Sequence, residues 1–121
     1  MTIRVLLADD QALLRATFRL LVDATDDMEV VAEAADGQDA VTKAREAQAD
    51  VVVMDIRMPG RDGVSVLREV GKPPPRVILM TAYAKERHLK EAREKAFAVV
   101  HKPFPVPQLL DLVASAVGAP T

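Results

Sequence analysis

The sequence predicts a single α/β domain in which a doubly wound, five-stranded parallel sheet is covered by helices on both faces. Short apolar runs, rich in β-branched residues, alternate along the chain with segments of helical periodicity. Hydrophobic residues make up 50% of the sequence and aromatic residues only 3%, so the core must be mainly aliphatic. Alternation of strands and helices at this spacing favours right-handed crossovers and therefore a parallel sheet.

The first half of the chain divides into strands and helices by the period of its apolar residues. Residues 51–54 read Val-Val-Val-Met, a run typical of a strand buried on both faces. Leu14, Phe18 and Leu21 recur at helical spacing and indicate an amphipathic helix. In order, the expected elements are a strand over residues 3–8, a helix over 11–23, a strand over 28–35, a helix over 38–48 and a strand over 51–54.

The second half continues the alternation. Gly71 ends one helix, and the prolines at 73–75 form a stiff connector because they fix φ and donate no hydrogen bond. A later helix is highly charged and has Leu89 as its only large apolar residue, so we expect it to be weakly held or paired with another element. In order, the expected elements are a helix over residues 64–70, a strand over 76–80, a helix over 84–95, a strand over 97–100 and a helix over 109–117.

Length, charge and cysteine content limit the possible functions. A chain of 121 residues can bury a sufficient core as one domain, expected over residues 1–121. The net charge of −2, with both signs interspersed, offers no basic surface for direct nucleic-acid binding. The absence of cysteine excludes disulfides and a thiol nucleophile. No apolar run approaches the ~20 residues that span a bilayer, so we expect a cytoplasmic protein without membrane contact.

Polar residues follow the predicted strands at their carboxyl ends. Asp9 and Asp10 follow the first strand, Asp55 the third, Thr81 the fourth and Lys102 the fifth. In a parallel sheet these ends meet at one edge, which is the ligand-binding edge of open α/β sheets. Clustered carboxylates repel unless they are protonated or bind a cation, and a hard cation such as Mg²⁺ suits oxygen ligands. A lysine and a hydroxyl nearby suit phosphoryl oxygens, and an aspartate can accept a phosphoryl group.

Each of these residues also has an ordinary structural explanation. Asp10 can be the N-cap of the following helix, and Asp9 a solvated turn residue. Asp55 precedes a Pro-Gly break and can be a simple turn former. Thr81 and Lys102 can be an ordinary strand threonine and surface lysine. Their coincidence at one edge of the sheet favours the functional interpretation.

Four motifs carry a resemblance to a known family. They are residues 6–10 (LLADD), 55–63 (DIRMPGRDG), 79–82 (LMTA) and 102–104 (KPF). Together they resemble the receiver domain of bacterial two-component response regulators, over essentially the whole chain. The resemblance implies a flavodoxin-like sheet of order 2-1-3-4-5.

The resemblance also implies a site. Asp55 would accept a phosphoryl group from the phosphohistidine of a partner sensor histidine kinase. Mg²⁺ would be held by Asp9, Asp10, Asp55 and the backbone carbonyl of Arg57. The protein would then be a signalling switch rather than an enzyme, assisting only its own phosphorylation and slow dephosphorylation.

By the same resemblance, Thr81 and Lys102 would contact the phosphoryl group, and the Lys102–Pro103 peptide bond would be cis. Residues 3–36 look most similar to receivers that precede a LuxR-type helix-turn-helix domain. The expected output is therefore transcription, through a DNA-binding domain absent from this chain or through a partner protein. A homodimer formed on phosphorylation is left open.

Three positions depart from the family pattern. Val99 stands where a switch aromatic is common, so output is less well predicted than phosphorylation. Lys95 and Ala98 stand where glycines are common, so a less regular junction is expected between the charged helix and the last strand. Arg57 and Tyr83 are bulky and flank the pocket, which predicts slow self-dephosphorylation.

Two alternatives remain open from the sequence. One is an interaction module that works without phosphorylation, which Val99 makes conceivable. The other is a Mg²⁺-dependent phosphohydrolase with an aspartyl nucleophile, although the residue two positions after Asp55 is Arg57 and not an acid that could protonate a leaving group.

Overall fold

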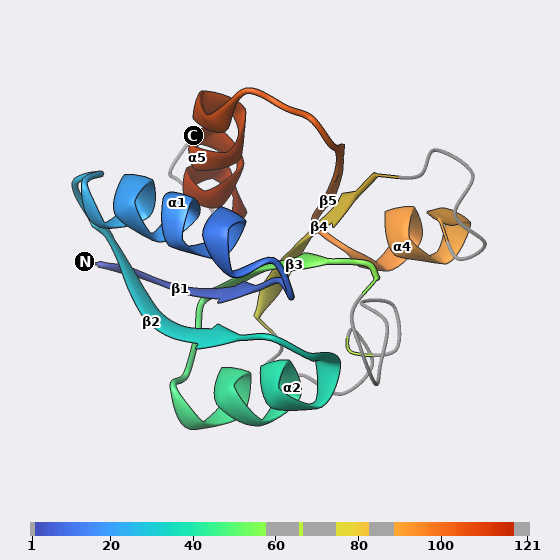
Figure 1. Cartoon of the computed structure of the whole chain (residues 1–121), viewed down its shortest axis with the longest axis horizontal. Helices are drawn as coiled ribbons and strands as arrows, with labels where there is room; N and C mark the ends of the chain where they lie inside the picture. Colours follow the sequence, from blue (N-terminus) through green and yellow to red (C-terminus); the bar gives the residue numbers. More distant parts are fainter. Residues whose placement is uncertain (1, 58–65, 67–74, 83–88, 118–121) are drawn as a thin grey trace.

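The computed structural model describes residues 2–57, 66, 75–82 and 89–117 of the 121-residue chain. It contains a five-stranded, all-parallel sheet of order β2-β1-β3-β4-β5 (Figure 1). The predicted fold and strand order are confirmed. The strands are β1 (Ile3–Ala8), β2 (Met28–Ala34), β3 (Val51–Asp55), β4 (Arg76–Thr81) and β5 (Ala98–His101).

Helices cover both faces of the sheet. In Figure 1, α1 and α5 lie above the sheet and α2 lies below it. The described helices are α1 (Ala12–Asp23), α2 (Gly37–Glu46), α4 (Leu89–Lys95) and α5 (Val106–Ala116). Alternate residues of each strand face opposite sides of the sheet, which creates two separate cores.

The two cores differ in the size of their helical residues. On one face, Phe18 of α1 and Leu109 of α5 pack against strand residues such as Val53. On the other face, α2 contributes mainly alanines, such as Ala40, which pack against residues such as Met54. Small side chains allow a helix to lie close to a sheet. The central strand β3 is buried by both layers, as its sequence predicts.

Several helix boundaries differ from those predicted. α1 begins at Ala12 with Gln11 as its N-cap, and no side chain caps it, so the interpretation of Asp10 as N-cap is wrong. Asp36 caps α2 by accepting a hydrogen bond from the backbone N–H of Asp39 at 2.8 Å. α5 begins at Val106, before the predicted residue 109. A proline is tolerated in its first turn, because the N–H that proline lacks would have no partner within the helix there.

The junction between α4 and β5 is regular. The N–H of Ala96 donates to the carbonyl of Ala92 at 2.8 Å, and that of Phe97 donates to the carbonyl of Val77 at 2.8 Å. Neither Lys95 nor Ala98 has positive φ, so glycine is not required at either position. The expectation of a less regular junction is therefore wrong.

Other predictions fall outside the described residues. These are the Met58–Gly63 part of the second motif, the helix over residues 64–70 apart from Val66, the proline connector before residue 75, Tyr83, and the first part of the helix over residues 84–95. Val66 is helical and fully buried. No helix in the described part of the chain is long and apolar enough to cross a membrane.

Candidate functional site

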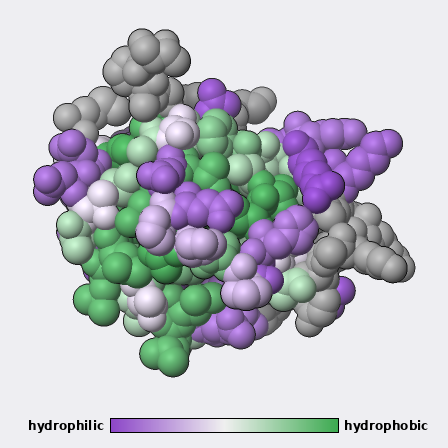
Figure 2. Space-filling model, turned by 90° about the horizontal axis from the view of Figure 1, so that it is seen from above, coloured by the Kyte–Doolittle hydropathy of each residue, from purple (hydrophilic) through white to green (hydrophobic). Residues whose placement is uncertain are grey.

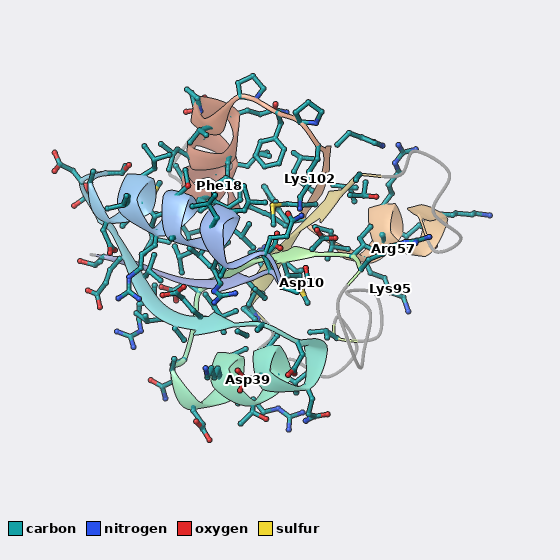
Figure 3. All side chains as sticks on the ribbon, in the orientation of Figure 1. Asp10, Phe18, Asp39, Arg57, Lys95 and Lys102 are labelled. Atoms are coloured by element: carbon teal, nitrogen blue, oxygen red, sulfur yellow. The ribbon has the colours of Figure 1, made fainter. Side chains whose placement is uncertain are left out.

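The predicted site residues lie at one end of the sheet. Asp9 directly follows β1, Asp55 is the last residue of β3, Thr81 the last of β4, and Lys102 directly follows β5. Figure 3 shows Lys102, Asp10 and Arg57 at this same carboxyl end. The parallel register produces this convergence from positions far apart in the sequence.

Lys102 joins two of the predicted carboxylates. Its Nζ lies 2.6 Å from Oδ2 of Asp55 and 3.1 Å from Oδ2 of Asp9. The three side chains are 17%, 14% and 2% exposed, respectively. The repulsion expected between the clustered carboxylates is thus relieved by a lysine that lies between two of them. The two oxygens are therefore spaced to share one cation.

Both carboxylates are also held by the backbone. The N–H of Gln11 donates to Oδ1 of Asp9 at 2.9 Å, and the N–H of Arg57 donates to Oδ1 of Asp55 at 2.9 Å. In each case the donor lies two residues after the acceptor, the short-range turn that aspartate favours after a strand. These bonds occupy the Oδ1 atoms, so the Oδ2 atoms remain to contact the ammonium of Lys102.

The surrounding charges change the titration of Lys102. Burial alone would lower its pKa, but the hydrogen bonds and negative charges of Asp55 and Asp9 outweigh this effect. The pKa of Lys102 is therefore raised above its ordinary value, and the side chain is a stable cation at neutral pH.

Thr81 is almost fully buried beside Lys102. Its residue is 1% exposed, and its carbonyl accepts a hydrogen bond from the N–H of Lys102 at 2.7 Å. The strand pairing of β4 and β5 places Thr81 opposite His101. The bond holds the chain at the point where it leaves β5. The Lys102–Pro103 peptide that follows is cis, as the family resemblance implies.

Asp10 is placed differently from Asp9. Its side chain is exposed, and it takes part in none of the hydrogen bonds or ion pairs found among the described residues. Within the described ranges, no group of three acidic or histidine side chains is arranged to hold a metal ion. The two carboxylates that do converge, Asp9 and Asp55, share Lys102.

The sequence interpretation missed a second group of charges beside the site. Arg15 of α1 donates from Nη1 to the carbonyl of Asp9 at 2.5 Å and from Nε to Oε1 of Glu33 at 3.0 Å. Arg15 was visible only as a polar residue on an amphipathic helix. Its place one and a half turns after the acidic pair was the available signal.

An apolar cavity of about 460 Å³ opens next to Lys102. The rings of Phe18 and Phe104 stack in its wall with centroids 5.9 Å apart. The exposed face seen in Figure 2 carries a broad apolar area, and Leu13 and Leu20 of α1 are 83% and 73% exposed. The cavity is lined by Leu14, Thr17, Phe18, Ala82, Lys102, Pro103, Phe104 and Val106.

Residues 5–114 match the response regulator receiver domain family. The chain is 35% identical over 117 residues to the transcriptional regulatory protein PdtaR of Mycobacterium tuberculosis (strain ATCC 25618 / H37Rv), an alignment that covers 95% of this chain and 57% of PdtaR. The chain spans about half the length of the curated relatives that it matches first, at 54% and 57% of their lengths.

Solved structures agree with the sequence match. The response regulator domain of Thermotoga maritima CheB superposes with a TM-score of 0.88 at 34% identity, covering 100% of both chains. A LuxR family DNA-binding response regulator from Staphylococcus aureus superposes with a TM-score of 0.87 at 28% identity, covering 98% of this chain and 100% of that one. The chain therefore belongs to the response regulator receiver family, the phospho-acceptor switch domains of two-component signalling systems.

Proposed function

We propose that Asp55 is the phospho-acceptor of this receiver domain. A carboxylate oxygen attacks the phosphorus of a phosphohistidine on a sensor histidine kinase. The new P–O bond forms as the P–N bond breaks, and the imidazole, protonated on its other ring nitrogen, keeps the electron pair and leaves as neutral histidine. The product is an acyl phosphate on Asp55. The main support is the position of Asp55, at the carboxyl end of the central strand with its Oδ2 on Lys102.

Lys102 has two roles in this proposal. Before phosphorylation its ammonium neutralises Asp55 and Asp9, which lets two carboxylates remain close in a partly buried site. After phosphorylation it contacts a phosphoryl oxygen. Its raised pKa supports this role, because the contact requires a charged ammonium. The hydroxyl of Thr81 supplies a hydrogen bond to another phosphoryl oxygen.

The residues present fit a magnesium ion. The Oδ2 atoms of Asp9 and Asp55 both face one ammonium, Nζ of Lys102, and carboxylate oxygens are ligands that Mg²⁺ prefers. Asp9 and Asp55, with Asp10 and the carbonyl of Arg57, would hold the ion. When bound, it neutralises charge that builds up on the transferring phosphoryl oxygens.

The partner and output are proposed at a coarser level. A sensor histidine kinase must bring its phosphohistidine to Asp55, and the apolar cavity beside Lys102 offers it a docking surface. The chain spans about half the length of relatives that include transcriptional regulators. We therefore infer that the output is transcription, through a further domain or a partner protein. Val99 excludes rotation of an aromatic ring at that position as the switching event.

Mass spectrometry of the intact protein tests the acceptor. The protein is incubated with Mg²⁺ and acetyl phosphate beside two variants, Asp55→Asn and the matched control Asp39→Asn, whose carboxylate lies on α2 away from the site. We expect one added phosphoryl group on the wild type and on Asp39→Asn, only with Mg²⁺, and none on Asp55→Asn.

Other outcomes have definite meanings. A phosphoryl group on Asp55→Asn would assign a different acceptor. If neither acetyl phosphate nor a phosphorylated kinase labels the wild type, the phosphorylation-independent module is favoured. Steady release of phosphate from a general phosphatase substrate would instead favour the phosphohydrolase. Slow loss of the phosphoryl group is expected because Arg57 flanks the acceptor, and a half-life of seconds would contradict this.

A further inference from the structure

We propose that Arg15 is a positioning residue for Asp9, anchored in turn by Glu33, and that this pair sets the affinity of the site for Mg²⁺. The inference rests on the proposed function, because it concerns the carboxylate assigned there to the cation. Among the bonds of the described residues Arg15 makes none to Asp55, and in this proposal it acts only through Asp9.

Arg15 reaches the site from one side of α1. Its Nη1 donates to the carbonyl of Asp9 at 2.5 Å, and its Nε donates to Oε1 of Glu33 at 3.0 Å. The side chain of Arg15 is 19% exposed and that of Glu33 27%, so these bonds are only partly shielded from solvent. A guanidinium is a rigid planar fork, and two bonds from different edges fix its orientation. Arg15 therefore connects the end of β1 to the edge strand β2.

Asp9 is held at each of its polar groups. Its N–H donates to the carbonyl of Ala34 at 3.0 Å, its Oδ1 accepts from Gln11, and its Oδ2 accepts from Lys102. Arg15 holds the remaining group, the carbonyl. The peptide that follows Asp9 contains this carbonyl, so its orientation also sets where the Gln11 turn begins. Loss of the Arg15 contact frees the peptide and, with it, the direction of the carboxylate.

Glu33 is a firm anchor because it is held at two points. Its carboxylate accepts from both Arg15 and Arg19, and its backbone carbonyl accepts from Nζ of Lys43 at 2.6 Å. Hydrogen bonds that orient metal-binding side chains commonly contribute about 10- to 100-fold to metal affinity. Arg15 differs from such partners in that it holds the backbone carbonyl of Asp9, so it orients the carboxylate through the peptide.

Arg19 provides a matched control within the same group. It pairs with Glu33 and also with Asp23 at 3.6 Å, and its side chain is 50% exposed. Unlike Arg15, it makes no contact with Asp9 among the bonds of the described residues. Removing Arg19 therefore removes an ion pair to Glu33 while the contact to Asp9 stays.

The test compares Arg15→Gln, Arg15→Lys and Arg19→Gln by calorimetric titration of the unphosphorylated full chain with MgCl₂. We expect the dissociation constant for Mg²⁺ to rise about 10-fold in Arg15→Gln. The dissociation constant of Arg15→Lys should rise by a similar factor, because an ammonium lacks the planar fork of a guanidinium that bonds both acceptors. Arg19→Gln should stay within about 2-fold of the wild type.

A second measurement does not depend on the metal. Amide hydrogen exchange at Gln11 reports its bond to Oδ1 of Asp9, so exchange should be faster in Arg15→Gln and unchanged in Arg19→Gln. Exchange at Asp39, whose N–H donates to Oδ1 of Asp36 at 2.8 Å at the start of α2, serves as the reference for general loosening.

The outcomes separate this inference from the proposed function. If the wild type binds Mg²⁺ and Arg15→Gln binds it equally well, Arg15 does not position Asp9 for the ion, and the inference is overturned. Equal weakening in Arg19→Gln overturns it too, because a general loss of charge would then explain both. If Mg²⁺ binds with the expected pattern while Asp55 gains no phosphoryl group, the inference holds and the acceptor assignment fails. If the wild type binds no Mg²⁺, both the metal site and this inference fail.

Discussion

Two charge clusters at neighbouring places in this domain are opposite in sign. At the carboxyl edge of the sheet, one cation, Lys102, lies between the carboxylates of Asp9 and Asp55. Between α1 and β2, one anion, Glu33, lies between the guanidinium groups of Arg15 and Arg19. The first cluster joins three strand ends, whereas the second joins one helix to an edge strand.

The clusters also differ in exposure, and this decides their energetics. Asp9 is 2% exposed and Lys102 17%, whereas Glu33 is 27% and Arg19 50% exposed. A charge left without its partner in a poorly solvated site is costly, whereas an exposed ion pair is worth little because water and salt screen it. The buried cluster should therefore dominate stability and its dependence on pH, although both contain the same kinds of bond.

Removal of the central cation should produce the largest effect. In Lys102→Met the apolar stem is kept, but Asp9 and Asp55 face each other without a positive charge. We expect the free energy of unfolding, measured by urea denaturation in EDTA at neutral pH, to fall by about 3 kcal/mol. Addition of Mg²⁺ should recover part of this loss, because the ion replaces the missing charge.

The control is Lys43→Met, which removes an exposed ion pair with Asp39 on α2 and one hydrogen bond to the backbone carbonyl of Glu33. The loss there should not exceed about 1 kcal/mol. If both substitutions cost the same, the distinction between a buried and an exposed cluster is wrong.

Alkaline pH should weaken the same cluster in the wild type. The pKa of Lys102 is raised because bonds and charges from Asp55 and Asp9 outweigh burial, which alone would lower it. A lysine whose pKa is higher in the folded state stabilises the fold below its unfolded value, about 10.4, and loses this contribution as pH rises through the folded value. The free energy of unfolding should therefore fall above about pH 10.4.

Lys102→Met supplies the comparison for that measurement. Urea denaturation of both proteins from pH 8 upward should show the difference between them shrinking at the alkaline end. A difference that stays constant through that range would show that the charge on Lys102 does not stabilise the fold.

The sequence predicts the buried cluster much better than the exposed one. Strand ends can be located from the apolar runs, and a parallel sheet must bring Asp9, Asp55 and Lys102 to one edge. The sequence does not show which oxygen faces the lysine. It also treats Asp9 and Asp10 alike, although the first is buried and the second exposed, because successive side chains after a strand point in different directions.

The exposed cluster has no such pattern in the sequence. Arg15 and Glu33 are 18 residues apart, on a helix and an edge strand whose relative rotation is set by core packing. The bond from Arg15 goes to a backbone carbonyl, so the type of residue at position 9 does not reveal it, and the place of Arg15 after the acidic pair is the one signal in the sequence. The helix boundary at Ala12 was missed for a related reason, since the bond from Gln11 to Asp9 competes with an ordinary side-chain cap at Asp10.

The smallest effect is expected from Glu33→Gln. Burial alone would raise the pKa of Glu33, but hydrogen bonds from Arg19 and Arg15 outweigh it, so the pKa is lowered. A carboxylate with a lowered pKa stabilises the fold above its unfolded value, about 4.3, and loses this contribution as pH falls through the folded value. The substitution should therefore cost about 1 kcal/mol at neutral pH and low salt, and less below about pH 4.

Salt separates the two clusters most directly. Because Glu33 and Arg19 are solvent-accessible, 1 M NaCl, where the screening length is about 3 Å, should remove most of the difference between Glu33→Gln and the wild type. The same salt should leave most of the difference for Lys102→Met, whose partners are shielded from solvent. If 1 M NaCl leaves the stability difference between Glu33→Gln and the wild type intact, Glu33 is shielded from solvent as well. The two clusters would then differ in the sign of their central charge but not in their exposure to solvent.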